Sequence, residues 1–105
     1  MVSRQFDVYR HPDDGRGGYP YLVCLQSDVA ETAGTVVIAP LVPAERVAAL
    51  RPQAFPEVLF EGSAYRVMIP QLAAVPRKLL KIPVGSIHGE RDKLLAAIDL
   101  LFTGI

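Results

Sequence analysis

The chain has 105 residues, a formal net charge of zero and a hydrophobic fraction of 50%. That length suits a single domain, residues 1–105, and the composition excludes a disordered chain. A neutral chain is not held on DNA or RNA by its overall charge, so we expect no direct sequence-specific nucleic-acid binding. No apolar stretch reaches the roughly 18 residues of a membrane span, and the N-terminus is too polar for a secretory signal, so we expect no membrane partner.

The first quarter of the chain predicts two antiparallel strands. Residues 5–10 alternate in polarity, with Phe6 and Val8 on one face, which is typical of a half-buried strand. Residues 11–20, HPDDGRGGYP, are dense in turn-forming residues and predict an exposed loop. Residues 21–26 then form the second strand, which we expect to pair antiparallel with the first.

The middle of the chain predicts further short strands. Residues 35–41, TVVIAPL, are β-branched and nearly all apolar, which indicates a central strand buried on both faces. The single cysteine, Cys24, lies in the apolar run YLVCL, and a lone thiol there predicts a small buried side chain in a reducing cytoplasm. Other elements follow in chain order: helical turns at 44–50, a hairpin of 58–60 and 64–69 turning at Glu61-Gly62, and strands at 71–75 and 81–84.

The hydrophobic period changes from about His88 onward. Apolar residues then follow the spacing of an amphipathic helix; they are Leu94, Leu95, Ile98, Leu101, Phe102 and Ile105. We expect Leu94, Ile98 and Leu101 to pack on the sheet. Ala97 and Leu100 widen the stripe beyond what one sheet needs, which predicts a homodimer. Short strands followed by one helix indicate an α+β domain with a small curved sheet or barrel.

A search for catalytic or cofactor motifs yields little. His11 and His88 lie far apart in the sequence, and a solvated histidine is the simpler interpretation of each. Asp13-Asp14-Gly15 lacks the further spaced oxygens of a calcium loop, and no glycine-rich phosphate motif precedes a helix. The basic cluster Pro76-Arg77-Lys78 with Lys81 is most simply a solvated edge. We therefore expect a binding protein and not an enzyme, with no cofactor and no metal.

Four blocks of the sequence together resemble the CcdB toxins, in the same order and at similar spacing. The blocks are YPYLVCLQSD, TVVIAPLVP, LAAVPRKLL and AIDLLFTGI, at residues 19–28, 35–43, 72–80 and 97–105. The resemblance implies the toxin of a type II toxin–antitoxin pair. It also implies a homodimer whose SH3-like barrel, shared with MazF ribonucleases, carries a C-terminal helix. Such toxins poison DNA gyrase by binding its A subunit and trapping the cleaved-DNA complex, and a CcdA antitoxin neutralises them.

The resemblance also assigns site residues. The family's gyrase contact lies at the end of the last helix, which corresponds here to Thr103, Gly104 and Ile105. Phe102 matches the family's preceding aromatic residue, but Thr103 departs from the pattern, because the best-known members have tryptophan there and this chain has none. The implied antitoxin contact, supported by the polar composition of HPDDGRGG, falls on five residues near the first turn: Arg10, His11, Asp13, Asp14 and Arg16.

Two other functions stay open from the sequence. The first is a MazF-like endoribonuclease on the same barrel, which would need a basic groove and a general acid or base near the sheet. The zero net charge and the isolated histidines count against it. The second is a CcdB-like protein that no longer poisons gyrase and only binds antitoxin, which the threonine at position 103 favours.

Overall fold

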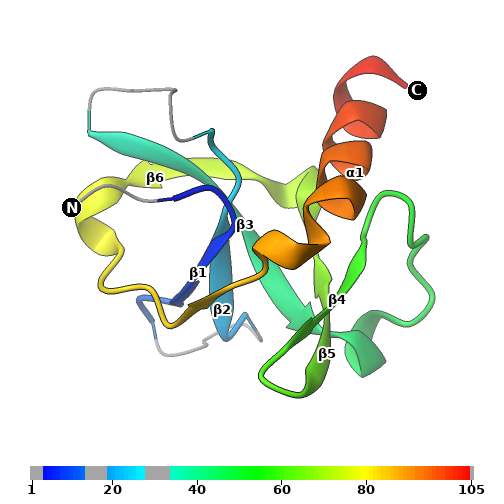
Figure 1. The fold of residues 1–105 in the computed structure, drawn as a ribbon, viewed down its shortest axis with the longest axis horizontal. Helices are drawn as coiled ribbons and strands as arrows, with labels where there is room; N and C mark the ends of the chain where they lie inside the picture. Colours follow the sequence, from blue (N-terminus) through cyan, green and yellow to red (C-terminus); the bar gives the residue numbers. More distant parts are fainter. Residues whose placement is uncertain (1–3, 14–18, 28–33, 105) are drawn as a thin grey trace.

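The protein is described by a computed structural model over residues 4–13, 19–27 and 34–104. In these ranges one antiparallel sheet of seven strands curls into a nearly closed barrel, and one α-helix lies beside it (Figure 1). The strands are β1 (Asp7–Arg10), β2 (Tyr21–Cys24), β3 (Thr35–Pro43), β4 (Glu57–Phe60), β5 (Ser63–Val67), β6 (Ala73–Pro76) and β7 (Gly85–Ser86). The helices are α1 (Arg91–Thr103) and the 3₁₀ turns η2 (Ala44–Val47), η3 (Ile69–Gln71), η4 (Arg77–Leu79) and η5 (His88–Glu90). This architecture confirms the expected α+β barrel with a C-terminal helix.

Strand β3 organises the sheet, as its apolar sequence predicts. It pairs with β2 along one edge, and its other edge is shared by β6 at its start and β5 at its end. Both edges of β3 are therefore paired, and its apolar side chains enter a separate cluster on each face. One cluster fills the barrel around Phe6, Val23 and Leu41. A second, on the outer face, joins Tyr9, Leu22, Cys24, Val36 and Ile38, so the expected burial of Cys24 is confirmed.

The β4–β5 hairpin turns at the predicted dipeptide. Glu61 has φ = 51° and Gly62 has φ = 80°, which is the pair of positive values that a two-residue type I′ turn requires.

Phe60, at the end of β4, packs directly over Gly85. A Cβ atom on Gly85 would lie 2.6 Å from Phe60 Cε1, so only glycine lets β7 pass beneath that ring.

The prediction of a strand at residues 81–84 is wrong. The strand in this region is β7, which is two residues long and pairs with β1 through Val8 and Gly85. Pro83 offers no N–H for a ladder hydrogen bond, and Ile82 is exposed to solvent, so the chain only joins the sheet at the Val84 N–H, 2.8 Å from the Val8 carbonyl. The neighbouring prediction, 71–75, is displaced, because Gln71 ends η3 and β6 begins at Ala73.

Only the first part of the apolar stripe of α1 packs against the open end of the barrel. Leu94 and Ala97 are fully buried in the barrel core, and Ile98 packs against it. Two expectations need correction. Ala97 belongs to the core and not to a surplus face, and Leu101 is 41% exposed instead of packed. The reason is geometric, because the last turns of α1 project past the barrel (Figure 1).

Candidate functional site at the end of the C-terminal helix

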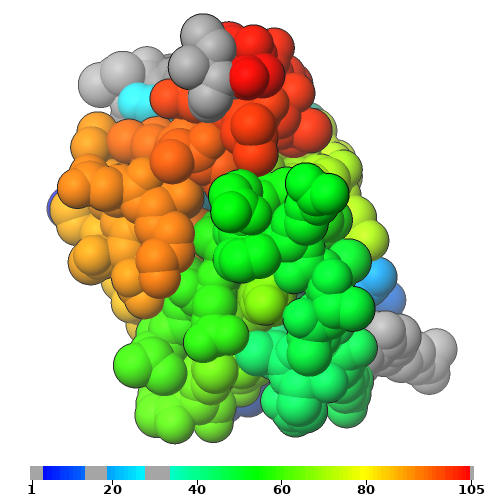
Figure 2. Space-filling view, turned by 90° about the vertical axis from the view of Figure 1, so that its right-hand side faces the viewer, coloured from blue at the N-terminus to red at the C-terminus, as the bar shows by residue number. Residues whose placement is uncertain are grey.

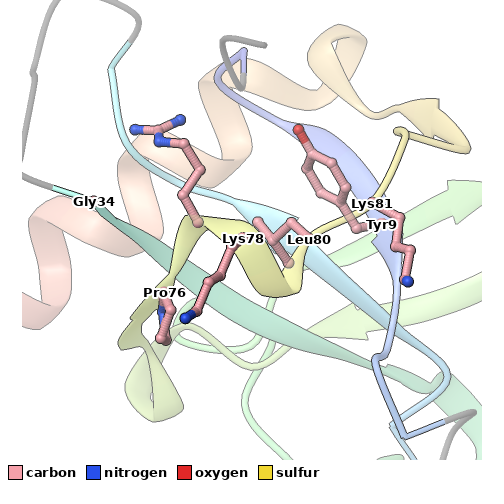
Figure 3. A pocket seen from close by; sticks show the side chains of 7 residues that line it. Tyr9, Gly34, Pro76, Lys78, Leu80 and Lys81 are labelled. Atoms are coloured by element: carbon pink, nitrogen blue, oxygen red, sulfur yellow. The ribbon is translucent and has the colours of Figure 1, made fainter.

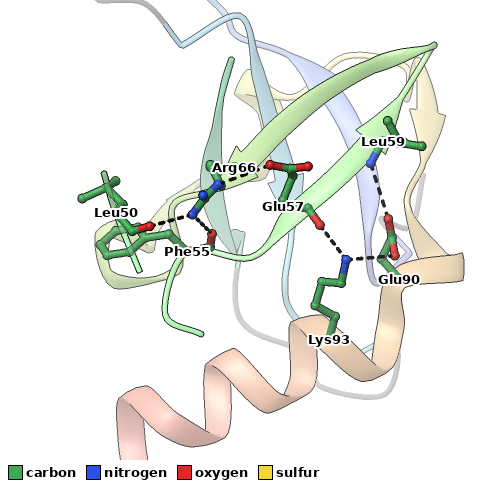
Figure 4. Close-up of polar contacts among 7 residues, drawn as sticks. All are labelled: Leu50, Phe55, Glu57, Leu59, Arg66, Glu90 and Lys93. Carbon is green, nitrogen blue, oxygen red and sulfur yellow. Dashed lines mark hydrogen bonds and ion pairs between the residues drawn. The ribbon is translucent and has the colours of Figure 1, made fainter. Parts of the chain in front are cut away.

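The first turn of α1 is held to the edge strand β4 by polar contacts (Figure 4). Lys93 Nζ donates to the Glu57 carbonyl at 2.8 Å and lies 3.7 Å from Glu90 Oε1. Glu90 Oε2 in turn accepts the Leu59 N–H at 3.4 Å. These side chains occupy backbone groups of an edge strand that would otherwise be open to pairing. Together with the buried Leu94, they fix the direction in which the helix projects.

The last turn of α1 presents apolar side chains to solvent. Phe102 is 68% exposed and Leu101 41% exposed, so the last turn of the helix carries two large apolar side chains in solvent. Figure 2 shows this end of α1, in red, at the top of one face of the molecule. Single solvated apolar residues are ordinary, so two of them in the last turn of one helix make this end a candidate, not a demonstrated, contact surface.

Thr103 and Gly104 complete this helix end in different ways. The Thr103 hydroxyl donates to the Asp99 carbonyl at 2.6 Å, one turn back, so its polar group is already used inside the helix. Gly104 has φ = 74° and its N–H donates to the Leu100 carbonyl at 3.0 Å, which closes the helix in the left-handed conformation. The expected role of Gly104 as a helix-ending residue is confirmed. Nothing lies within 4 Å of a Cβ built on it, so its surface is open to a partner.

The electrostatics of the helix end favour a cationic partner. The last turn contains no basic residue, so no side chain of that turn offsets the partial negative charge of the helix C-terminus. An aromatic face such as that of Phe102 also attracts a guanidinium or ammonium group. The surface at the end of α1 is thus mainly apolar, and its electrostatic potential is weakly negative.

The residues expected to contact antitoxin lie elsewhere. Arg10 ends β1 and is exposed, and His11 and Asp13 follow it in the same turn, where the Asp13 N–H donates to His11 Nδ1 at 3.0 Å. The structure therefore brings these three together and separates them from the helix end, which lies at the opposite side of Figure 1. Ile105, Asp14 and Arg16 fall outside the described residues.

The described residues contain no constellation that resembles a catalytic or metal site. No group of three or more metal-binding side chains occurs among them. His88 packs 6.4 Å from the Phe6 ring, whereas His11 lies in the turn after β1. Burial, with Tyr21 as the next contribution, raises the pKa of the Tyr65 phenol, but this group belongs to a packed aromatic cluster with Tyr21 and Phe60. In the described part of the chain, no helix has the length and apolarity needed to cross a membrane.

Fold and candidate site together define a small barrel protein whose C-terminal helix ends in exposed apolar side chains. A comparison with protein-family models identifies the particular family. The model of the CcdB protein matches residues 5–104, nearly the whole chain, and the chain belongs to the CcdB family. Membership of this family suggests the toxin of a toxin–antitoxin pair.

Two features of the surface were not found by the sequence patterns. Helical periodicity placed Leu101 in the core, because the period alone does not show where the barrel ends along the helix. The basic cluster is expected to be solvated, and Lys78 and Lys81 are indeed exposed, but the sequence does not show that they and Arg77 line a pocket around Leu80, which packs on the outer apolar cluster (Figure 3). The proximity of this pocket to β1 depends on sheet topology, which no local pattern encodes.

Proposed function

We propose that this protein is the toxin of a type II toxin–antitoxin pair and that it acts by binding, not by catalysis. Its target is the A subunit of DNA gyrase, whose cleaved-DNA complex it traps. The observation that carries this proposal is the exposed pair Leu101 and Phe102 beside a left-handed Gly104, in a chain of the CcdB family. We further propose that the whole chain is one toxin domain, that it works as a cytoplasmic homodimer, and that a CcdA-like antitoxin neutralises it.

The gyrase contact rests on Thr103, Gly104 and Ile105 with Phe102 beside them. Because the Thr103 hydroxyl is bonded within the helix, this residue offers a partner chiefly a methyl group. A tryptophan there would supply a large rigid contact, and loss of such an aromatic typically costs about 2 kcal/mol or more, roughly thirtyfold in affinity. We therefore expect weaker gyrase binding than a tryptophan-bearing toxin shows, carried mainly by Phe102 and the glycine.

The test is expression of the protein in a gyrase-sensitive bacterium and in a strain whose gyrase resists CcdB. Growth arrest limited to the sensitive strain supports the proposal. Phe102→Asp should abolish arrest, while Leu59→Asp is a matched control, because both side chains are 68% exposed and Leu59 lies on β4. Arrest in both strains, or arrest unaffected by Phe102→Asp, would overturn the assignment to gyrase.

A second candidate function is a chain that binds antitoxin without poisoning gyrase, and the threonine at position 103 favours it. Thr103→Trp separates the two. If the wild-type chain is harmless and Thr103→Trp restores gyrase-dependent arrest, the fold is a gyrase binder with a weakened contact. If both are harmless but purified protein still binds a CcdA-like antitoxin, the second function holds.

A further inference from the structure

The contacts of α1 with the barrel core lie toward the N-terminal end of the helix. Leu94 and Ala97 are 0% and 1% exposed, and Ile98 packs partly against the same core. Residues 101–104 are all exposed. At 1.5 Å per residue, the chain continues about 10 Å beyond Ala97 to Gly104. The position of the last turn therefore depends on the angle at which the first turns are held.

Apolar packing by itself restrains this angle weakly. Leu94 and Ala97 lie on one stripe of the helix, and hydrophobic contact is non-directional, so a helix can rock about such a stripe with little change in buried area. A hydrogen bond is directional and weakens steeply when it bends. A polar contact beside the stripe therefore restrains the angle more than further apolar burial does.

Lys93 and Glu90 form such a contact with β4, which we term the polar clamp (Figure 4). Lys93 lies about 100° around the helix from Leu94, so it reaches the strand from beside the apolar stripe. Its Nζ donates to the Glu57 carbonyl at 2.8 Å, and Glu90 accepts the Leu59 N–H. Because Glu57 and Leu59 are two residues apart in one strand, the two attachment points lie about 7 Å apart along β4. Two separated points resist rotation of the helix, whereas a single point does not.

We propose that Lys93 and Glu90 are positioning residues for the contact at the end of α1. They set the angle of the helix against the barrel, and thereby the place of Phe102, without contacting the partner themselves. Phe102 lies eight residues beyond Leu94, so a rotation of about 10° around Leu94 displaces it by about 2 Å. A helix end that is held in its bound position loses less freedom on binding, which favours affinity. The effect on growth arrest rests on the proposed function, whereas the angle of the helix does not.

Two simpler interpretations of the polar clamp make different predictions. In the first, Lys93 and Glu90 are an exposed ion pair, 3.7 Å apart, of a kind that often contributes nothing measurable. Their replacement would then leave the helix unchanged. In the second, they only cover the edge of β4 against pairing with another chain. Their replacement would then cause association between copies and leave the helix angle unchanged.

The experiment measures residual dipolar couplings of the backbone N–H groups by nuclear magnetic resonance in the full-length protein. Couplings in α1, compared with those in β3, report the angle of the helix and its range of motion. In Lys93→Met the couplings of residues 94–103 should shrink relative to those of β3, while the couplings within β3 stay in proportion. Lys93→Arg keeps a cationic donor and should restore most of the wild-type ratio. Arg91→Met is the matched control, because Arg91 is an exposed cation of the same turn, and it should leave the ratio unchanged.

Growth arrest is scored separately in the same variants. One hydrogen bond contributes about as much free energy as a fivefold change in an equilibrium constant, so the released helix should occupy the clamped angle about one fifth of the time. The expression level of Lys93→Met that is needed for gyrase-dependent arrest should therefore rise about fivefold.

Three results would overturn the proposal. They are a ratio of couplings in Lys93→Met equal to that of the wild type, an equal change in Arg91→Met, and a changed ratio without any change in the expression level needed for arrest. A larger particle mass by light scattering with an unchanged ratio would replace it with edge protection. If the ratio changes but the wild type causes no gyrase-dependent arrest, the polar clamp still sets the helix angle and the proposed function fails by itself.

Discussion

Replacement of Arg66 by methionine should destabilise the fold strongly, although Arg66 lies at no proposed contact. This arginine is 8% exposed on β5, and its Nη1 donates to the carbonyls of Leu50 and Phe55 at 3.0 Å each (Figure 4). It thereby ties the irregular segment after η2 to the sheet. Its Nε lies 3.8 Å from Glu57 Oε1 and has no hydrogen-bond partner.

The size of the effect follows from these contacts. A hydrogen bond from a charged donor contributes about 1.5–3 kcal/mol, so the two bonds set an upper limit of roughly 6 kcal/mol. Two terms reduce it: Leu50 and Phe55 are only partly buried, so water can reach their carbonyls in the variant, and the unbonded Nε already costs desolvation energy in the wild type. We expect a net loss of about 2–3 kcal/mol for Arg66→Met, which corresponds to a fall in Tm of roughly 10 °C or more.

Urea unfolding followed by circular dichroism measures this loss, with Arg51→Met as the control. Arg51 is an exposed arginine of the same segment, and its replacement should change the free energy of unfolding by less than about 0.5 kcal/mol. Arg66→Lys should lie between the wild type and Arg66→Met, because an ammonium group does not reproduce the planar guanidinium. A loss in Arg66→Met no larger than that in Arg51→Met would refute the reasoning.

Three further substitutions test the packing and the helix end by the same unfolding measurement. Leu94→Ala removes a fully buried side chain that joins α1 to the barrel and should cost about 2–5 kcal/mol. Gly85→Ala should cost about 1–3 kcal/mol, since the added methyl would lie 2.6 Å from Phe60 Cε1 and force the ring to move. Gly104→Ala should cost only about 1 kcal/mol, from φ = 74° alone, yet reduce gyrase-dependent growth arrest.

Much of the fold could be predicted from the sequence where one local rule was decisive. The run TVVIAPL predicted a central strand, because a strand with apolar residues on both faces must be buried on both. β3 is paired along both edges and has an apolar cluster on each face. The dipeptide Glu61-Gly62 predicted the hairpin turn, because a two-residue turn needs positive φ values and glycine adopts them readily. Apolar content favours a strand at 81–84, but Pro83 cannot donate a ladder hydrogen bond. The strand in this region depends instead on Gly85 passing under Phe60, which is a tertiary contact.

The sequence predicts where the candidate site lies along the chain, but not which of its apolar side chains are exposed to solvent. The spacing of apolar residues locates α1 and its stripe, and a glycine after the last turn indicates its end. Whether Leu94 or Leu101 reaches the core depends on the length of the barrel that the helix crosses. Since that length is set by strand pairing far away in the sequence, periodicity treated both residues alike. The hollows around Leu80 do not follow from the sequence for a related reason, because they join β1, β6 and η4, which are distant in the chain.

The two proposed contacts lie far apart on the molecule, and this separation has a mechanistic consequence. The helix end lies at the upper right of Figure 1, while residues 11–13, which follow β1 directly, lie at the lower left. We therefore expect a partner bound only at Arg10, His11 and Asp13 to leave Phe102 accessible to a second partner. Substitutions at the two surfaces should accordingly have additive effects on binding energies, as independent sites do.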